Sequence, residues 1–148
     1  MLYRRCYFAN PRKLGCRIVI ILDTCALVFD ALNPEKLTKK VIKIIEKAEQ
    51  QSLLFCCDIS LWEIAMLIQK KRLNPDVDTQ TFLNLILTAR SISVLEINAS
   101  IAALSTQHPF QHHDPADRLI ASTARHHQAS LITCDEHLSK VPGLQVIW

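Results

Sequence analysis

Short apolar runs alternate with amphipathic stretches along the whole chain. Apolar runs of strand length lie at 18–22, 53–57, 93–97, 130–134 and 144–147. Between them, apolar residues recur at helical spacing over 34–50, 60–73, 78–90, 99–106, 115–127 and 136–141. Because strands alternate with helices and no hairpin signal occurs, the pattern predicts an α/β fold in which helices sandwich a parallel sheet.

Polar residues and prolines predict where several of these helices begin. Asn33 with Pro34, Ser60, Asn98 and Asp114 each stand before an amphipathic stretch. Side chains of these types accept hydrogen bonds from the free N–H groups of a first turn, and proline is tolerated at the first helical position. We therefore expect them to be N-caps.

Length and charge set the domain organisation. The chain has 148 residues, 49% of them hydrophobic, which suits one domain, here residues 18–148. Residues 1–17 carry five basic side chains and no acid, and the rest has 12 basic and 14 acidic residues. We expect 1–17 to be a basic extension that is poorly ordered or reflects an overlong start assignment. No apolar run is long enough for a membrane span or a signal peptide.

Cysteine, histidine and glycine usage excludes several kinds of site. The six cysteines form no C-x-x-C pair, so we interpret them as small buried apolar residues of a cytoplasmic protein. The six histidines have no companion cysteine at zinc-finger spacing. Gly15 and Gly143 are the only glycines, which excludes the glycine-rich loops that hold dinucleotides or nucleoside triphosphates.

Four carboxylates are predicted at one edge of the sheet. Asp23 and Asp135 follow strands, and Glu63 and Asp117 lie in the first turns of helices. The carboxyl ends of parallel strands and the N-termini of the following helices share an edge. Four close negative charges repel one another unless a cation compensates them, and Mg²⁺ or Mn²⁺ prefers carboxylate oxygens. The arrangement suits phosphodiester hydrolysis.

Each acid also has a purely structural explanation. Glu63 stands three residues after Ser60 and could complete a capping box. Asp117 could interact with the helix dipole, and Asp23 and Asp135 could be turn residues. The sequence disfavours a haloacid-dehalogenase-like phosphatase, which needs a D-x-D motif, because Thr24 and Cys25 follow Asp23 here.

The acidic segments resemble those of a known family. ILDTCAL, SLWEIAML, HHDPADRLIASTA and LITCDEHL are similar to the motifs of PIN-domain ribonucleases, specifically VapC-type toxins of VapBC toxin–antitoxin modules. The most specific element is H-x-D-P-x-D-R-L-I-A. The resemblance implies a three-layer α/β/α fold with a five-stranded parallel sheet of order 3-2-1-4-5, dependence on Mg²⁺ or Mn²⁺, and endonucleolytic cleavage of RNA.

The same resemblance implies roles for individual residues. Asp23, Glu63 and Asp117 would be the core metal ligands, and Asp135 the more variable fourth acid. Asp114 would be chiefly the helix cap, with a supporting role beside the ligands as the alternative.

Three further side chains match positions next to the family's site. The hydroxyls of Thr24 and Thr133 would hydrogen-bond the carboxylates or a metal-bound water. Arg118 would either contact phosphate or form a salt bridge.

The resemblance also implies partners. Toxins of this type are inhibited by a small antitoxin and commonly form homodimers. The alternative is a PIN-like module that binds RNA or a protein without cutting, although such a copy would be expected to have lost a ligand. The RNA target stays open between transfer, ribosomal and messenger RNA.

Overall fold

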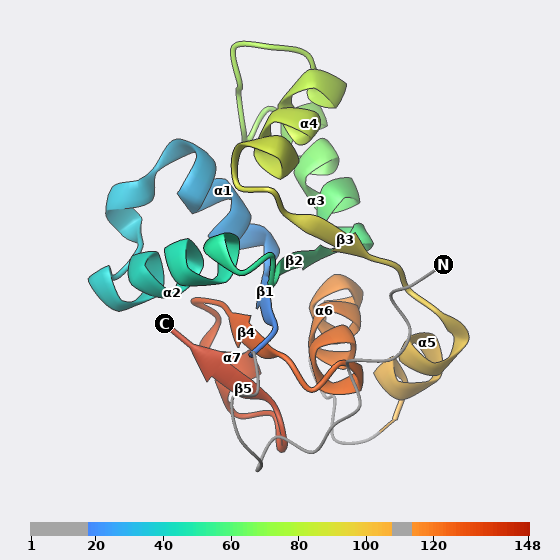
Figure 1. Cartoon of the computed structure of the whole chain (residues 1–148). Coiled ribbons are helices and arrows are strands. Elements are labelled where there is room, and N and C mark those ends of the chain that lie inside the picture. Colours follow the sequence, from blue (N-terminus) through green and yellow to red (C-terminus); the bar gives the residue numbers. More distant parts are fainter. Residues whose placement is uncertain (1–17, 108–113) are drawn as a thin grey trace, which may run out of the picture.

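The computed structural model describes residues 18–107 and 114–148, which form one α/β unit (Figure 1). The strands are β1 Ile20–Leu22, β2 Leu54–Cys57, β3 Ser93–Leu95, β4 Ser130–Ile132 and β5 Gln145–Ile147. The helices are α1 Thr24–Leu32, α2 Lys39–Gln50, α3 Asp58–Gln69, α4 Thr79–Ala89, α5 Ala99–Ser105, α6 Pro115–His126 and α7 Glu136–Ser139, with a 3₁₀ turn, η1, at Pro34–Lys36. The basic segment 1–17 and residues 108–113 lie outside the described part.

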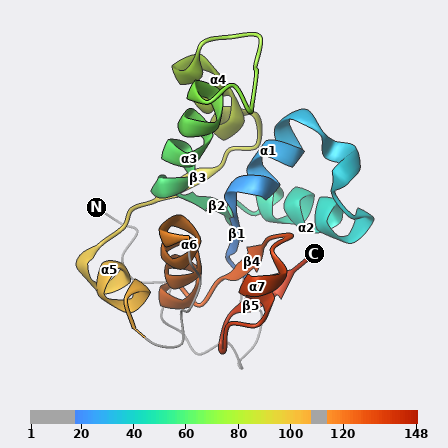
Figure 2. The same cartoon turned by 180° about the vertical axis from the view of Figure 1, so that it is seen from behind.

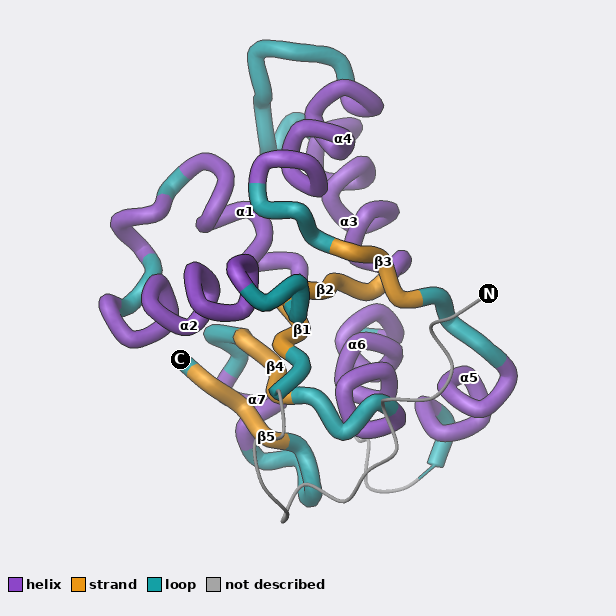
Figure 3. The backbone as a smooth tube through the Cα atoms, in the orientation of Figure 1, coloured by secondary structure: helices purple, strands orange, loops and turns teal. Residues whose placement is uncertain are grey.

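The five strands form one parallel sheet in the middle of the molecule (Figure 3). Their order is β3-β2-β1-β4-β5, so the predicted order and the predicted fold class are confirmed. Leu22, the last residue of β1, is in register with Cys56 of β2 and Ile132 of β4. The three central strands therefore end at one level, and the residues after them meet at one edge.

Successive residues of β1 feed two separate cores. Ile20 and Leu22 pack in a cluster with residues of α1, α2, α3 and α4, whereas Ile21 packs in a cluster with residues of α6 and α7. Figures 1 and 2 show α1 and α2 on one side of the sheet and α5 and α6 on the other. A strand covered on both faces has no polar side, which explains the uninterrupted apolar run at the start of the domain.

The first crossover differs from the prediction. We expected one helix to begin at Asn33, but α1 begins directly after Asp23 and Asn33 is its C-cap. The proline at position 34 opens η1, and Thr38 caps α2 by accepting a hydrogen bond from the Val41 N–H at 3.1 Å. Asp23 therefore has a role as an N-cap that the strand pattern alone did not predict.

The start of α3 also differs from the prediction. Ser60 is not its N-cap, because the helix begins at Asp58 with Cys57 in the cap position. Ser60 is fully buried, and its hydroxyl has no hydrogen-bond partner among the described residues. The capping box with Glu63 is therefore wrong, and Glu63 lies in the second turn. The predicted caps Asn98 and Asp114 are confirmed.

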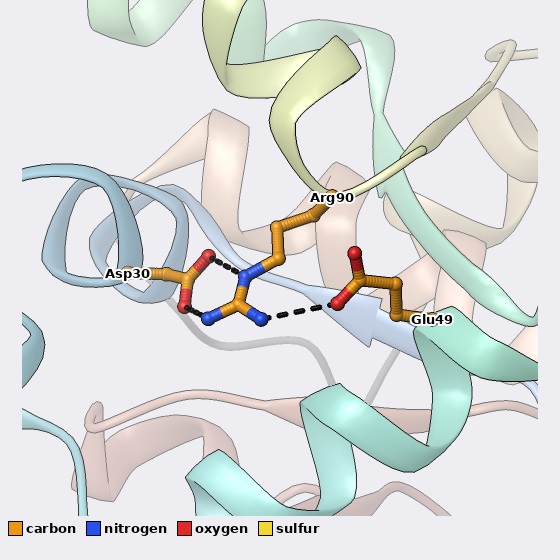
Figure 4. Close-up of polar contacts among 3 residues, drawn as sticks. All are labelled: Asp30, Glu49 and Arg90. Carbon is orange, nitrogen blue, oxygen red and sulfur yellow. Dashed lines mark hydrogen bonds and ion pairs between the residues drawn. The ribbon is translucent and has the colours of Figure 1, made fainter.

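An ion triad ties the helices on one side of the sheet together (Figure 4). Arg90, the C-cap of α4, contacts Asp30 of α1 at 2.9 Å and Glu49 of α2 at 3.0 Å. Its Nε also donates to the second oxygen of Asp30 at 3.0 Å. The hydrogen bonds to Asp30 chiefly, and to Glu49, raise the pKa of Arg90 above its already high usual value. One cation thus joins three segments that are distant in sequence.

Two of the cysteine predictions are wrong. Cys56 and Cys57 of β2 are buried as expected, but Cys25 is half-buried and Cys134 is exposed. Both of these lie at the edge where the strands end. Within the described ranges, no helix is long and apolar enough to cross a membrane.

Candidate functional site

Asp23 occupies the centre of the edge formed by the strand ends. Asp23 is 5% exposed. It is the N-cap of α1, and one of its carboxylate oxygens accepts a hydrogen bond from the Ala26 N–H at 2.8 Å. The other oxygen accepts the Cys25 thiol at 3.4 Å. Burial raises the pKa of Asp23, and the nearby charge of Asp135 adds to this, whereas hydrogen bonds from Thr133, Ala26 and Cys25 oppose it.

Thr133 links Asp23 to the acid at the end of the neighbouring strand. It is buried, hydrogen-bonds Asp23, and accepts the Asp135 N–H at 3.0 Å. Asp135 in turn caps α7 by accepting the His137 N–H at 2.7 Å. Asp23 and Asp135 therefore lie next to each other, and the Thr133 side chain is hydrogen-bonded both to the Asp23 carboxylate and to the backbone N–H of Asp135.

Glu63 reaches the site from the third helix of the chain. Its carboxylate accepts a hydrogen bond from the hydroxyl of Thr24, the first residue of α1. Burial raises the pKa of Glu63, the charges of Asp114 and Asp23 add to the rise, and the Thr24 hydrogen bond opposes it. Neither Asp23 nor Glu63 forms an ion pair within the described residues.

The first turn of α6 provides the remaining predicted side chains. Asp114 caps it by accepting the Ala116 N–H at 2.9 Å, and its charge acts on Glu63. Asp117 lies one turn further along and is partly buried. Arg118 is also partly buried and makes no salt bridge with the residues that the structure describes.

The donor set fits a hard divalent cation. Its members are carboxylate oxygens, the ligands that Mg²⁺ and Mn²⁺ prefer, and the buried Asp23 has no neighbouring cation among the described residues. Within residues 18–107 and 114–148, however, no three Asp, Glu, His or Cys side chains already converge as a metal site. Like charges spread apart when nothing compensates them, so a cation would have to draw the carboxylates together.

A groove of about 390 Å³ extends from the acidic edge between α3 and α6. Glu63 and Asp114 line it together with Lys70, Arg72 and the 58% exposed Trp62. The sequence does not reveal this groove, because Trp62 and Asp114 come to line it together only through the packing of α3 against α6. The sequence gives no signal for the groove, because the exposure of Trp62 is visible only in the folded structure.

Two close thiols were also missed. The Sγ atoms of Cys25 and Cys134 are 2.8 Å apart, although 109 positions separate them. Burial, with the Asp23 charge next, raises the pKa of Cys25. Their proximity follows from the parallel pairing of β1 with β4, which places the residues after both strands side by side.

Comparison with known proteins identifies the family of the chain. A family profile described as the PIN domain matches residues 20–144. The chain belongs to the PIN-domain family. This PIN domain is 29% identical to Ribonuclease VapC22 of Mycobacterium tuberculosis over 120 residues, which cover 80% of this chain and 88% of the relative.

Solved structures share the fold. The complex of VapBC2 from Rickettsia felis with a DNA fragment from its promoter contains a chain that superposes with a TM-score of 0.68 at 18% identity. DNA-bound VapBC from Salmonella typhimurium gives 0.67 at 17% identity. In both cases the match covers 88% of this chain and 98% of the other. At such identities the likeness shows the α/β/α fold of this PIN domain.

Proposed function

We propose that this PIN domain is a metal-dependent endoribonuclease and the toxin of a VapBC-type toxin–antitoxin system. One observation carries the proposal: the buried carboxylate of Asp23 lies at the strand ends beside Asp135 and Glu63, without an ion pair among the described residues. The family and the ribonuclease relative support the same activity.

Asp23, Glu63, Asp117 and Asp135 would hold Mg²⁺ or Mn²⁺. When bound, such an ion supplies an activated water and neutralises charge that develops on the phosphate. The protein supplies orientation. Thr24 hydrogen-bonds Glu63, and Thr133 and the Ala26 N–H do the same for Asp23, which limits the rotamers that both carboxylates can adopt. Arg118, which has no salt bridge among the described residues, is available for phosphate.

The groove offers a path for the RNA strand. An exposed indole provides a surface on which a base can stack, and basic side chains can contact phosphates. Trp62, Lys70 and Arg72 provide these groups on a surface that is continuous with Glu63. Contacts on either side of the cleaved bond would position it at the carboxylates.

A small antitoxin, a homodimeric assembly and a cytoplasmic location complete the proposal. The two structural neighbours named above are VapBC complexes, which supports a partner of the VapB kind. An enzyme that cuts cellular RNA must be inhibited in growing cells, and its substrates are in the cytoplasm. Light scattering during size-exclusion chromatography, with and without the cognate antitoxin, measures both associations.

The test is cleavage of total RNA by antitoxin-free protein in Mg²⁺, Mn²⁺ or EDTA. We expect discrete fragments with either metal and none in EDTA. Asp23→Asn and Asp117→Asn should each lower the rate by at least about a hundredfold, because each removes a charged ligand. Asp76→Asn, which changes an exposed acid between α3 and α4, is the matched control and should cleave normally.

Folding and metal binding need separate measurements. Circular dichroism checks that the variants fold, and the Tm rise on adding Mn²⁺ reports binding without any RNA. Failure of folded wild type to cut RNA from several sources with both metals would refute the nuclease and favour a PIN-like module that binds RNA or protein.

A further inference from the structure

Two thiols that the proposed nuclease activity does not use lie at the acidic edge. Cys25 is in the first turn of α1, and Cys134 lies in the segment between β4 and α7. Their sulfur atoms are 2.8 Å apart, whereas the sulfurs of a disulfide are separated by about 2 Å. The two atoms thus need to approach by less than an ångström to become bonded.

The two members of the pair differ in access to solvent. Cys134 is exposed and Cys25 is half-buried behind it. The other two cysteines that the structure describes, Cys56 and Cys57, are buried in the central part of the sheet. An oxidant in solution therefore meets Cys134 first and finds Cys25 already in contact with it.

We propose that Cys25 and Cys134 are a reversible oxidation site whose disulfide lowers the activity of the acidic edge. Formation of the disulfide stands independently of any enzyme activity. Its effect on cleavage rests on the nuclease function proposed above.

The oxidant is a peroxide, and the reaction balances in two steps. The Cys134 sulfur attacks one oxygen of hydrogen peroxide and the O–O bond breaks. The leaving hydroxide takes up the thiol proton to become water, and Cys134 becomes a sulfenic acid. The Cys25 sulfur then attacks the Cys134 sulfur, forming the S–S bond and breaking the S–O bond, and a second water leaves. The two thiols lose two protons and two electrons in total, and these reduce the peroxide to two waters. A dithiol reductant reverses the change by thiol–disulfide exchange.

The bridge would act on the carboxylates through their nearest neighbours. The Cys25 thiol is a hydrogen-bond donor to Asp23, and oxidation removes that proton. Cys134 directly precedes Asp135, whose N–H is bonded to Thr133. A covalent link would fix the segments that carry Asp23 and Asp135 at one separation. A cation has to move these carboxylates into its own coordination geometry. Segments that can no longer move independently would adjust to it less well, which would weaken metal binding and cleavage.

The experiment treats reduced full-length protein with hydrogen peroxide and maps its peptides by mass spectrometry without reduction. We expect a Cys25–Cys134 cross-link with the loss of two hydrogens. We also expect at least a tenfold drop in RNA cleavage and a smaller Tm rise with Mn²⁺, both reversed by dithiothreitol. Cys134→Ser should cleave as the reduced wild type does and should keep its activity in peroxide. Cys56→Ala removes a buried thiol and should respond as wild type does.

Each contrary result is distinct. Oxidation of Cys134 without the cross-link overturns the disulfide. A cross-link that changes neither cleavage nor the Mn²⁺-induced Tm rise overturns its regulatory effect. A reduced protein that cuts no RNA refutes the nuclease proposal, while the mass spectrum still decides whether the bridge forms.

Discussion

Two groups of carboxylates in this PIN domain lie in opposite electrostatic environments. Asp30 and Glu49 share the guanidinium of Arg90, with contacts of 2.9 and 3.0 Å (Figure 4). Among the described residues, Asp23 and Glu63 have only hydroxyl, thiol and backbone donors. The charge of Asp23 adds to the rise in the pKa of Glu63, and the charge of Asp135 adds to the rise in the pKa of Asp23. The first group is complete within the fold. The second group has no ion pair among the described residues, and this difference is the reason we propose it as the functional site.

Among the variants that test this comparison, removal of the Arg90 guanidinium should change the free energy of unfolding the most. Arg90→Met keeps the aliphatic part of the side chain but leaves Asp30 and Glu49 without their partner. We expect a loss of about 2 kcal/mol in the free energy of unfolding, since the triad is only partly buried. Urea denaturation measures it.

RNA cleavage by Arg90→Met, measured well below its Tm, should be unchanged. Lys43→Met, which removes an exposed cation of α2, is the matched control and should unfold like wild type. An equal loss in both variants would mean that the triad contributes nothing specific.

The opposite result is expected at the acidic edge. Asp23→Asn keeps a good N-cap residue for α1 and removes a buried charge. In EDTA at pH 7 we expect the variant to be more stable than wild type by about 1 kcal/mol, because burial raises the pKa of Asp23. Thermal unfolding measured from pH 4 to pH 8 checks this.

The pH dependence has a definite sign. The pKa of Asp23 is raised in the folded state. Below about pH 4 this side chain is protonated in both the folded and the unfolded state, so its ionisation costs the wild type no stability there. It loses stability as the pH rises through the folded-state pKa. The gap between variant and wild type should therefore grow with pH in EDTA and shrink or reverse in Mn²⁺. A gap that is constant with pH would contradict the assignment of the effect to this carboxyl.

The smallest expected effect tests the corrected start of α3. Ser60→Ala should change the free energy of unfolding by no more than about 0.5 kcal/mol, because the buried hydroxyl has no partner among the described residues to lose. Thr38→Ala is the control, since Thr38 does cap α2, and should cost about 1 kcal/mol. A comparable cost for Ser60→Ala would show that its hydroxyl has a partner in solution.

The sequence was sufficient for the elements that depend on local pattern. Apolar runs identified all five strands, and the caps Asn98 and Asp114 were predicted correctly because an N-cap acts within its own turn. Local signals failed where two compete. Asn33–Pro34 is typical of a helix start, yet α1 was already formed from Thr24 and Asn33 ended it.

The sequence by itself also determined which carboxylates, Asp23 and Asp135, follow strands, and therefore which edge of the sheet carries them. Only the tertiary structure decided what each one contacts. Glu63 is bonded to Thr24 rather than to its own helix, Arg90 joins Asp30 to Glu49, and Cys25 meets Cys134. These contacts join segments separated by 39 to 109 positions, and the order of strands in the sheet brings them together. Periodicity along a chain describes which face a residue occupies, whereas contacts between distant segments depend on how those faces pack.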